Sequence, residues 1–246
     1  MEILAGVVGL SRSARSRLAG YGYACPAAST EALKEKHQMK RHVPVVALAL
    51  VALAPLVAQP PQGWKMRVDR STAASDPDAA GDIKFVTMGS GFHATNPQAA
   101  VYWNPANTVA GTYALKGTFT LMKPSGHTNY YGLVFGGSGL EGPQQSYLYF
   151  VVAQNGTWLI KRRDGEATSI VSPKTPNDAV KKPDASGRST NALEVRVGAD
   201  KIDFEVNGVV VHTEPKSGAT AKTEGIYGIR VNHLLEVQVD GLTVSK

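Results

Sequence analysis

Aromatic side chains and one arginine are spaced in the sequence so that they could form a binding surface for a sugar. Tyr147 and Tyr149 alternate along one predicted strand, and the register inferred below places Arg162 on the same face. Aromatic rings pack against the apolar side of a pyranose ring, and Arg donates hydrogen bonds to its hydroxyls. An alternative is that these rings only pack within a sheet, because aromatic residues favour strands. The predicted ligand-binding residues are Trp103, Tyr131, Tyr147, Tyr149 and Arg162.

No set of residues has a spacing that indicates catalysis or metal binding. His93, His127, His212 and His233 are scattered and match no zinc-binding motif, so we predict no zinc site. His127 and His233 fall in predicted loops, where a histidine could contact a ligand but is more often simply solvated. Residues 136–139 are glycine-rich, but they precede no helix and predict a turn or bulge rather than a phosphate-binding loop. We therefore assign no catalytic residue, no metal ligand and no cofactor.

The positive charge of the chain is concentrated at its N-terminal end. The formal net charge is +6, but residues 1–58 contain seven of the 26 Lys and Arg and only three of the 20 Asp and Glu. The remainder is nearly neutral and has no basic cluster of the kind that binds nucleic acid. We expect no nucleic-acid partner.

A hydrophobic segment near the N-terminus predicts export. Residues 43–58 are uncharged and follow Lys40, Arg41 and His42. Starting at Met39, the sequence has a positively charged region, an apolar region and a small residue at the expected cleavage site. This is the pattern of a secretory signal peptide over residues 39–58. The alternative is an uncleaved membrane anchor, but a spanning helix needs about 20 apolar residues. We predict a secreted or periplasmic protein, with a membrane contact only if the signal stays uncleaved.

Residues 1–38 do not fit the pattern of a signal peptide or of a domain. Because apolar signal regions rarely begin so far from the start, we interpret this segment as a misassigned upstream extension, with translation starting at Met39. Cys25, the single cysteine of the chain, lies here, so no intrachain disulfide can form. Residues 59–81 are expected to be a linker or a first strand, and residues 82–246 the folded domain.

The region after Trp64 is rich in short runs of β-branched and aromatic residues separated by Gly, Asn, Asp and Pro. No segment has a sustained helical period, so the fold class predicted is all-β, a two-sheet antiparallel β-sandwich. Residues 172–190 contain several prolines and predict a long surface loop. The predicted strands are 65–68, 83–88, 99–103, 112–122, 130–135, 146–153, 157–163, 192–197, 201–206, 209–214, 225–231 and 235–244.

Two Asn-Gly pairs predict β-hairpins with two-residue type I′ turns, at 155–156 and at 207–208. The second turn would pair Val206 with Val209 and Phe204 with Val211, with Glu205 on the solvent face. The first turn would pair Tyr149 with Arg162. Both faces of this first hairpin are largely apolar, which predicts a central position in a sheet or a face that lines a groove.

The order of these elements resembles the concanavalin A-like lectin/glucanase superfamily in its laminin-G-like jelly-roll form. It looks most like the secreted bacterial 3-keto-disaccharide hydrolase-like family. The resemblance covers roughly two-thirds of the chain. It rests on the strand and turn motifs at residues 131–137, 146–166, 191–197, 201–211, 225–231 and 237–244.

The resemblance implies a jelly roll whose partner is a carbohydrate or a glycan surface. Residues 201–205 partly match the strand of alternating carboxylates in laminarinase-type glycosidases, but Lys201 takes the place of the nucleophile and cannot serve as one. Some relatives bind Ca²⁺, which makes Asp240 and other loop acids candidate ligands, although no calcium-loop spacing is present.

Three functions follow as alternatives. The first is a lectin-like, non-catalytic carbohydrate-binding domain. The second is a glycoside hydrolase of the 3-keto-disaccharide hydrolase type. The third is a structural or protein-interaction domain.

The signal-peptide prediction is tested by sequencing the N-terminus of the exported protein. We expect the mature chain to begin near Gln59, because Ala58 is the small residue at the end of the apolar segment. Mass spectrometry of the precursor checks the start at Met39, and a peptide from residues 1–38 would contradict it.

Overall fold

The computed structural model describes residues 60–71 and 73–246. The predicted extension at 1–38 and the predicted signal peptide at 39–58 lie outside the described residues and remain predictions. Among the described residues, no helix has the length and apolar character needed to cross a membrane.

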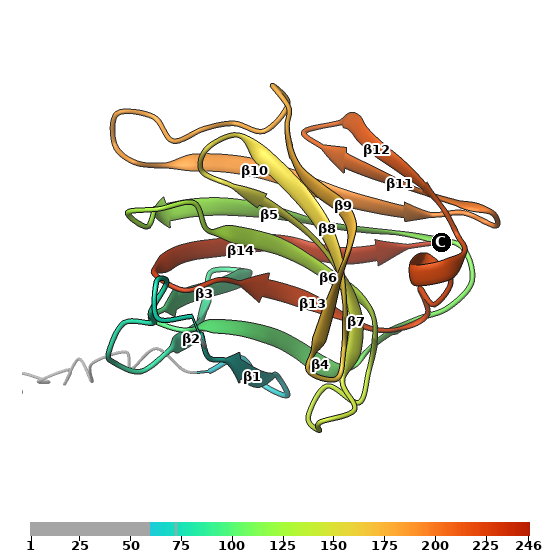
Figure 1. Cartoon of the computed structure of the whole chain (residues 1–246), viewed down its shortest axis with the longest axis horizontal. Helices are drawn as coiled ribbons and strands as arrows, with labels where there is room; N and C mark the ends of the chain where they lie inside the picture. The colour runs from blue at the N-terminus through green and yellow to red at the C-terminus, as the bar shows by residue number, and fades with distance from the viewer. Residues whose placement is uncertain (1–59, 72) are drawn as a thin grey trace, which may run out of the picture. The chain divides into compact units, whose positions relative to one another are not determined.

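The described chain forms two antiparallel sheets of seven strands, packed face to face (Figure 1). This confirms the predicted all-β jelly-roll sandwich. Sheet 1 has the order β1 (Lys65–Asp69), β4 (Ala99–Val109), β13 (Gly225–Val231), β6 (Tyr130–Ser138), β7 (Ser146–Ala153), β8 (Thr157–Asp164) and β9 (Ala167–Pro176). Sheet 2 has the order β12 (Val209–Pro215), β11 (Lys201–Val206), β10 (Ser189–Val197), β5 (Tyr113–Lys123), β14 (Leu235–Ser245), β3 (Gly91–Asn96) and β2 (Lys84–Met88).

The twelve predicted strands are all present, and two further strands were missed. The first is β3, which pairs with β14 and β2 in sheet 2. The second is β9, whose C-terminal half falls in the predicted loop at 172–190 and includes Pro173 and Pro176. Proline is tolerated there because β9 is the edge strand of sheet 1 and has hydrogen bonds to make on one side only.

Strand β7 of sheet 1 is apolar on both faces. In β7, Leu148, Phe150 and Val152 point into the main core between the sheets. Tyr147, Tyr149 and Val151 alternate with them and belong to a second buried cluster on the outer face of sheet 1. The predicted two-sided apolar character is therefore confirmed for β7, and both strands of the hairpin lie in the interior of sheet 1, as one of the two predicted alternatives requires. The outer face of β8 differs, because it carries Lys161 and Arg163.

The predicted register of the β7–β8 hairpin is wrong by one residue. Tyr149 pairs with Lys161, not with Arg162, and Val151 pairs with Leu159. The loop has three residues: the Gly156 amide donates to the Ala153 carbonyl at 3.1 Å, and Gly156 alone in the loop has a positive φ, +86°. This is the arrangement of a three-residue hairpin loop ending in a left-handed glycine, whereas a type I′ turn needs positive φ at Asn155 as well.

The β11–β12 hairpin has the predicted type I′ turn. Asn207 and Gly208 have φ of 52° and 80°, and Val206 pairs with Val209. A bulge between Phe204 and Glu205 then shifts the register, so that Phe204 pairs with His212 rather than with Val211. Glu205 is buried instead of solvent-facing, and its carboxylate lies 3.1 Å from the Arg196 guanidinium.

A glycine in β13 allows the central strands of sheet 1 to pack closely. A Cβ atom at Gly228 would lie 2.1 Å from the backbone oxygen of Tyr102. Because that atom is part of a paired strand, we expect Gly228→Ala to lower the free energy of unfolding by at least about 2 kcal/mol. Urea denaturation measures the change. The matched control is Gly142→Ala, whose Cβ would meet no atom closer than 3.9 Å; equal stabilities of the two variants would contradict the prediction.

Candidate functional site

A pocket of about 350 Å³ opens on the outer face of sheet 1. Strands β6, β7, β8, β9 and β13 supply most of its lining, and the segment between β1 and β2 adds Asp76. Its volume is within the range of small-molecule sites. The lining residues are Asp76, Thr128, Asn129, Tyr130, Tyr147, Tyr149, Val151, Leu159, Lys161, Arg163, Thr168, Lys174, Arg230 and Asn232.

The floor of the pocket consists of two tyrosines and a guanidinium. The rings of Tyr147 and Tyr149 lie 5.6 Å apart, and the guanidinium of Arg230 lies 5.2 Å from the centre of the Tyr149 ring. Arg230 also donates to the Tyr147 hydroxyl at 3.1 Å and to Asn232 Oδ1 at 3.1 Å. A cation over an aromatic face stabilises both groups and orients the ring.

Asp69 at the end of β1 neutralises Arg230. Its Oδ2 accepts hydrogen bonds from Arg230 Nη1 and from the Tyr147 hydroxyl. Burial raises the pKa of Tyr147 to about 12, so its hydroxyl stays protonated and keeps donating. Burial alone would lower the pKa of Arg230, but Tyr147 and Asp69 more than offset it and raise that pKa, so the guanidinium remains charged.

The walls of the pocket carry cations. Lys161 and Arg163 lie on the same face of β8 as Leu159, and Lys174 reaches in from β9, where its Nζ lies 5.6 Å from the Tyr130 ring centre. Burial, together with the charges of Arg230 and Lys174, lowers the pKa of Lys161. Neither lysine has a carboxylate within ion-pairing distance among the described residues. The pocket is therefore electropositive and suited to an anion.

The five predicted ligand-binding residues are not together. Tyr147 and Tyr149 line the pocket. Trp103 shares their face of sheet 1 but is buried and borders a different cavity, which residues 139–144 also line. Tyr131 points into the main core, with its hydroxyl 3.4 Å from Asn191 Nδ2. Arg162 lies near the end of β8 on the face opposite the pocket, where it donates to the Ser146 hydroxyl at 2.6 Å.

The sequence analysis did not predict the cationic residues of the pocket. The correct register of the β7–β8 hairpin would have predicted two of them, Lys161 and Arg163. With Tyr149 opposite Lys161, the alternation of β8 places Lys161 and Arg163 on the tyrosine face. The position of Arg230 also has a sequence signal, since it is a charged residue between the buried Ile229 and Val231 of β13.

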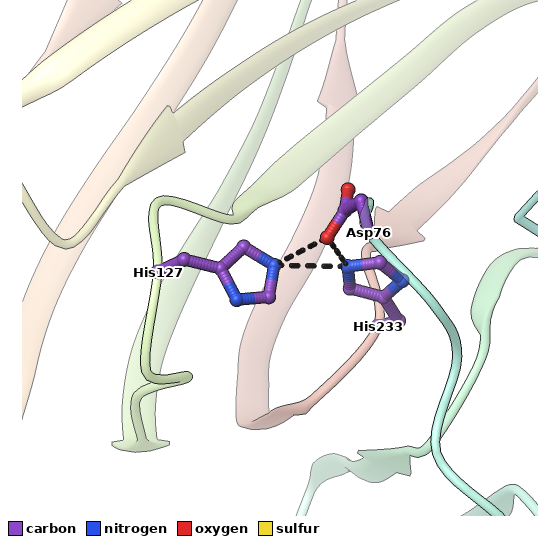
Figure 2. Close-up of side chains that lie close together, drawn as sticks. All are labelled: Asp76, His127 and His233. Atoms are coloured by element: carbon purple, nitrogen blue, oxygen red, sulfur yellow. Dashed lines mark hydrogen bonds and ion pairs between the residues drawn. The ribbon is translucent and has the colours of Figure 1, made fainter. Parts of the chain in front are cut away.

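A second polar cluster lies next to the pocket and joins three segments that are distant in sequence. Figure 2 shows the rings of His127 and His233 directed at the same carboxylate, that of Asp76. Asp76 Oδ1 lies 2.7 Å from His127 Nε2 and 3.1 Å from His233 Nε2, and the two Nε2 atoms are 3.1 Å apart. The sequence spacing predicted no metal ligands, but these three residue types at these distances are a set that could hold a metal ion.

The three residues of this cluster lie in three different loops, and hydrogen bonds hold each loop in place. His233 follows β13 in a tight turn and donates from Nδ1 to Asp78 Oδ1 at 2.9 Å. Asp78 in turn accepts from the Ser71 amide at 2.8 Å, and the Ser71 hydroxyl donates to the Asp76 carbonyl at 2.6 Å. His127 lies in the loop between β5 and β6. The Gln154 amide group holds that loop through Ser125 Oγ, 3.1 Å away, and the His127 carbonyl.

Comparison with solved structures shows the same fold in carbohydrate-related proteins. The carbohydrate binding module CBM66 from Bacillus subtilis is 12% identical, with a TM-score of 0.52 over 75% of this chain and 96% of that chain. A GH16 protein of the Bacteroides ovatus mixed linkage glucan PUL, solved in complex with a product, is 9% identical, with a TM-score of 0.51 over 76% of this chain and 97% of that chain.

These likenesses show a shared fold and support the predicted jelly-roll β-sandwich. No protein-family model matches the sequence, and no curated protein matches it.

The Asp69–Arg230 pair is tested by Asp69→Asn. Both side chains are mostly buried, with exposed fractions of 9% and 12%, so removal of the carboxylate leaves a guanidinium without a counter-charge. We expect a loss of about 3 kcal/mol in the free energy of unfolding, measured by urea denaturation. As the control, Asp164→Asn removes an acid that is 71% exposed and 4.0 Å from Arg162, and it should cost under about 1 kcal/mol. A loss for Asp69→Asn no larger than that of the control would refute the pairing.

Proposed function

We propose that the protein is a secreted carbohydrate-binding domain that holds an acidic saccharide in the pocket on the outer face of sheet 1. The observation that carries the proposal is the pocket itself, with the rings of Tyr147 and Tyr149 at its floor and Lys161, Lys174 and Arg230 around them. The fold, shared with a carbohydrate binding module, supports the choice of ligand class, and the predicted signal peptide supports secretion.

The aromatic floor favours a ring-shaped ligand. Tyr149 is 8% exposed to solvent and lines the pocket. Tyr147 is buried, and its hydroxyl is hydrogen-bonded to Asp69 and Arg230. An aromatic face of this kind packs against the apolar side of a pyranose, and Asn129 and Asn232 supply amide groups for hydroxyls.

The charge of the pocket favours an acidic sugar over a neutral one. Burial lowers the pKa of Lys161, and repulsion by Arg230 and Lys174 lowers it further. A carboxylate or sulfate group of a saccharide would relieve this repulsion and accept charge-assisted hydrogen bonds. A uronic acid or a sulfated sugar is therefore the expected ligand.

The same lining supports binding rather than glycoside hydrolysis. A glycosidase of the common type needs two carboxyl groups flanking the scissile bond. Among the described residues that line the pocket, Asp76 is the single carboxylate. The pocket likewise supports a ligand-binding role over a purely structural domain, whose outer sheet face would be expected to be filled and flat.

Binding is tested with a thermal-shift screen of the purified protein against neutral, uronate and sulfated oligosaccharides. We expect stabilisation by the acidic sugars alone, weakened by added salt because the contact is ionic. Calorimetry on the best ligand should then show at least tenfold weaker binding for Lys161→Gln, since that change removes a cation from the pocket wall.

The control for this test is Lys201→Gln, which removes an exposed lysine of sheet 2 paired with Asp203. It should bind as the unchanged protein does. Equal loss in both variants, or no stabilisation by any saccharide at millimolar concentration, would reject the proposed function.

A further inference from the structure

We propose that Asp76, His127 and His233 form a binding site for a divalent transition-metal ion at the rim of the pocket. Two imidazoles and one carboxylate are a ligand set that Zn²⁺ and related ions use. The site requires no saccharide, so it stands independently of the proposed function.

The spacing of the three ligand atoms suits a metal ion. They are separated by 2.7, 3.1 and 3.1 Å. With metal–ligand bonds of about 2.0–2.2 Å, neighbouring ligand atoms lie roughly 3.0 Å apart around an octahedral ion and 3.3–3.5 Å apart around a tetrahedral one. The three atoms thus already form one face of a coordination shell, and each needs to move by only a few tenths of an ångström.

The three ligand atoms converge on one another. The Nε2 atoms of His127 and His233 both face Asp76 Oδ1, and they also face each other. A cation between the three atoms would receive a lone pair from each of them. The single lone pair of His127 Nε2 would then pass from Asn129 Nδ2, which lies 3.0 Å away, to the ion.

The surroundings of His233 are those of a metal ligand. Its Nδ1 donates to Asp78, which assigns the lone pair of the neutral ring to Nε2, the atom that faces Asp76 and His127. The side chain of His233 is 6% exposed, so its orientation is held by packing as well. The carboxylates of Asp76 and Asp78 together carry two negative charges, which match one divalent cation.

Three protein ligands leave coordination positions open, as in zinc sites that bind a further molecule. Asp76 also lines the pocket, so an ion held here would have its free positions next to the pocket. The metal would then tie together the segment before β2, the β5–β6 loop and the β13–β14 turn.

The test is calorimetric titration of the full chain with Zn²⁺ after removal of metals by a chelator, without any saccharide. We expect one equivalent of Zn²⁺ to bind at this site and to raise the melting temperature. His127→Ala and Asp76→Asn, which change side chains that are 44% and 46% exposed, should fold normally and bind this equivalent at least tenfold more weakly. Asp78→Asn should weaken it about 10–100-fold through His233.

His93→Gln is the matched control, because His93 also lies 3.0 Å from a carboxylate, that of Glu236, but in a pair rather than a triad. It should keep the affinity of the unchanged chain. Titration with Co²⁺ adds a spectroscopic readout: nitrogen and oxygen ligands give weak visible bands, whereas Cys25 would give intense thiolate charge transfer.

Two results would overturn the metal site: no Zn²⁺ equivalent that stabilises the fold, or an affinity that His127→Ala and Asp76→Asn leave unchanged. Failure of saccharide binding would leave the metal site standing, since the two are measured separately.

Discussion

A buried guanidinium on the outer face of sheet 1 is the feature on which the candidate site depends. Arg230 lies in a central strand, and its charge is stabilised by Asp69 from the edge strand β1 and by the hydroxyl and ring of the two tyrosines of β7. An unpaired charge there would be costly, so β1, β13 and β7 must keep their relative positions. The same contacts fix the positions of the groups on the pocket floor.

The composition of the pocket walls follows from one turn. A three-residue loop at 154–156 places Lys161 opposite Tyr149, and the alternation of β8 then puts Leu159, Lys161 and Arg163 on the outer face. A two-residue turn would have sent Arg162 there instead and turned Lys161 toward the core. Because side chains alternate with a period of two, a slip of one residue exchanges the two faces of a strand.

The site combines a rigid sheet with loops. The tyrosines and cations project from paired strands, whereas Asp76, His127 and His233 come from three connections that meet beside them. Loops carry such groups without disturbing the sheet, and here hydrogen bonds from Ser71, Gln154 and His233 fasten the three loops. An aromatic, cationic floor next to a cluster of lone-pair donors is an arrangement that can recognise a polar, charged ligand from two sides.

The sequence by itself determined the fold class, twelve of the strands, the type I′ turn at Asn207-Gly208 and the two-sided apolar character of β7, because these follow from local periodicity and turn chemistry. It also placed Tyr147 and Tyr149 on one face of the same strand. Only the tertiary structure decided the register of β7–β8, the burial of Tyr131, the pairing of Asp69 with Arg230 and the meeting of His127 with His233. Asp69 and Arg230 are 161 residues apart and the histidines 106. Contacts over such separations depend on how strands are ordered in a sheet, which no local pattern specifies.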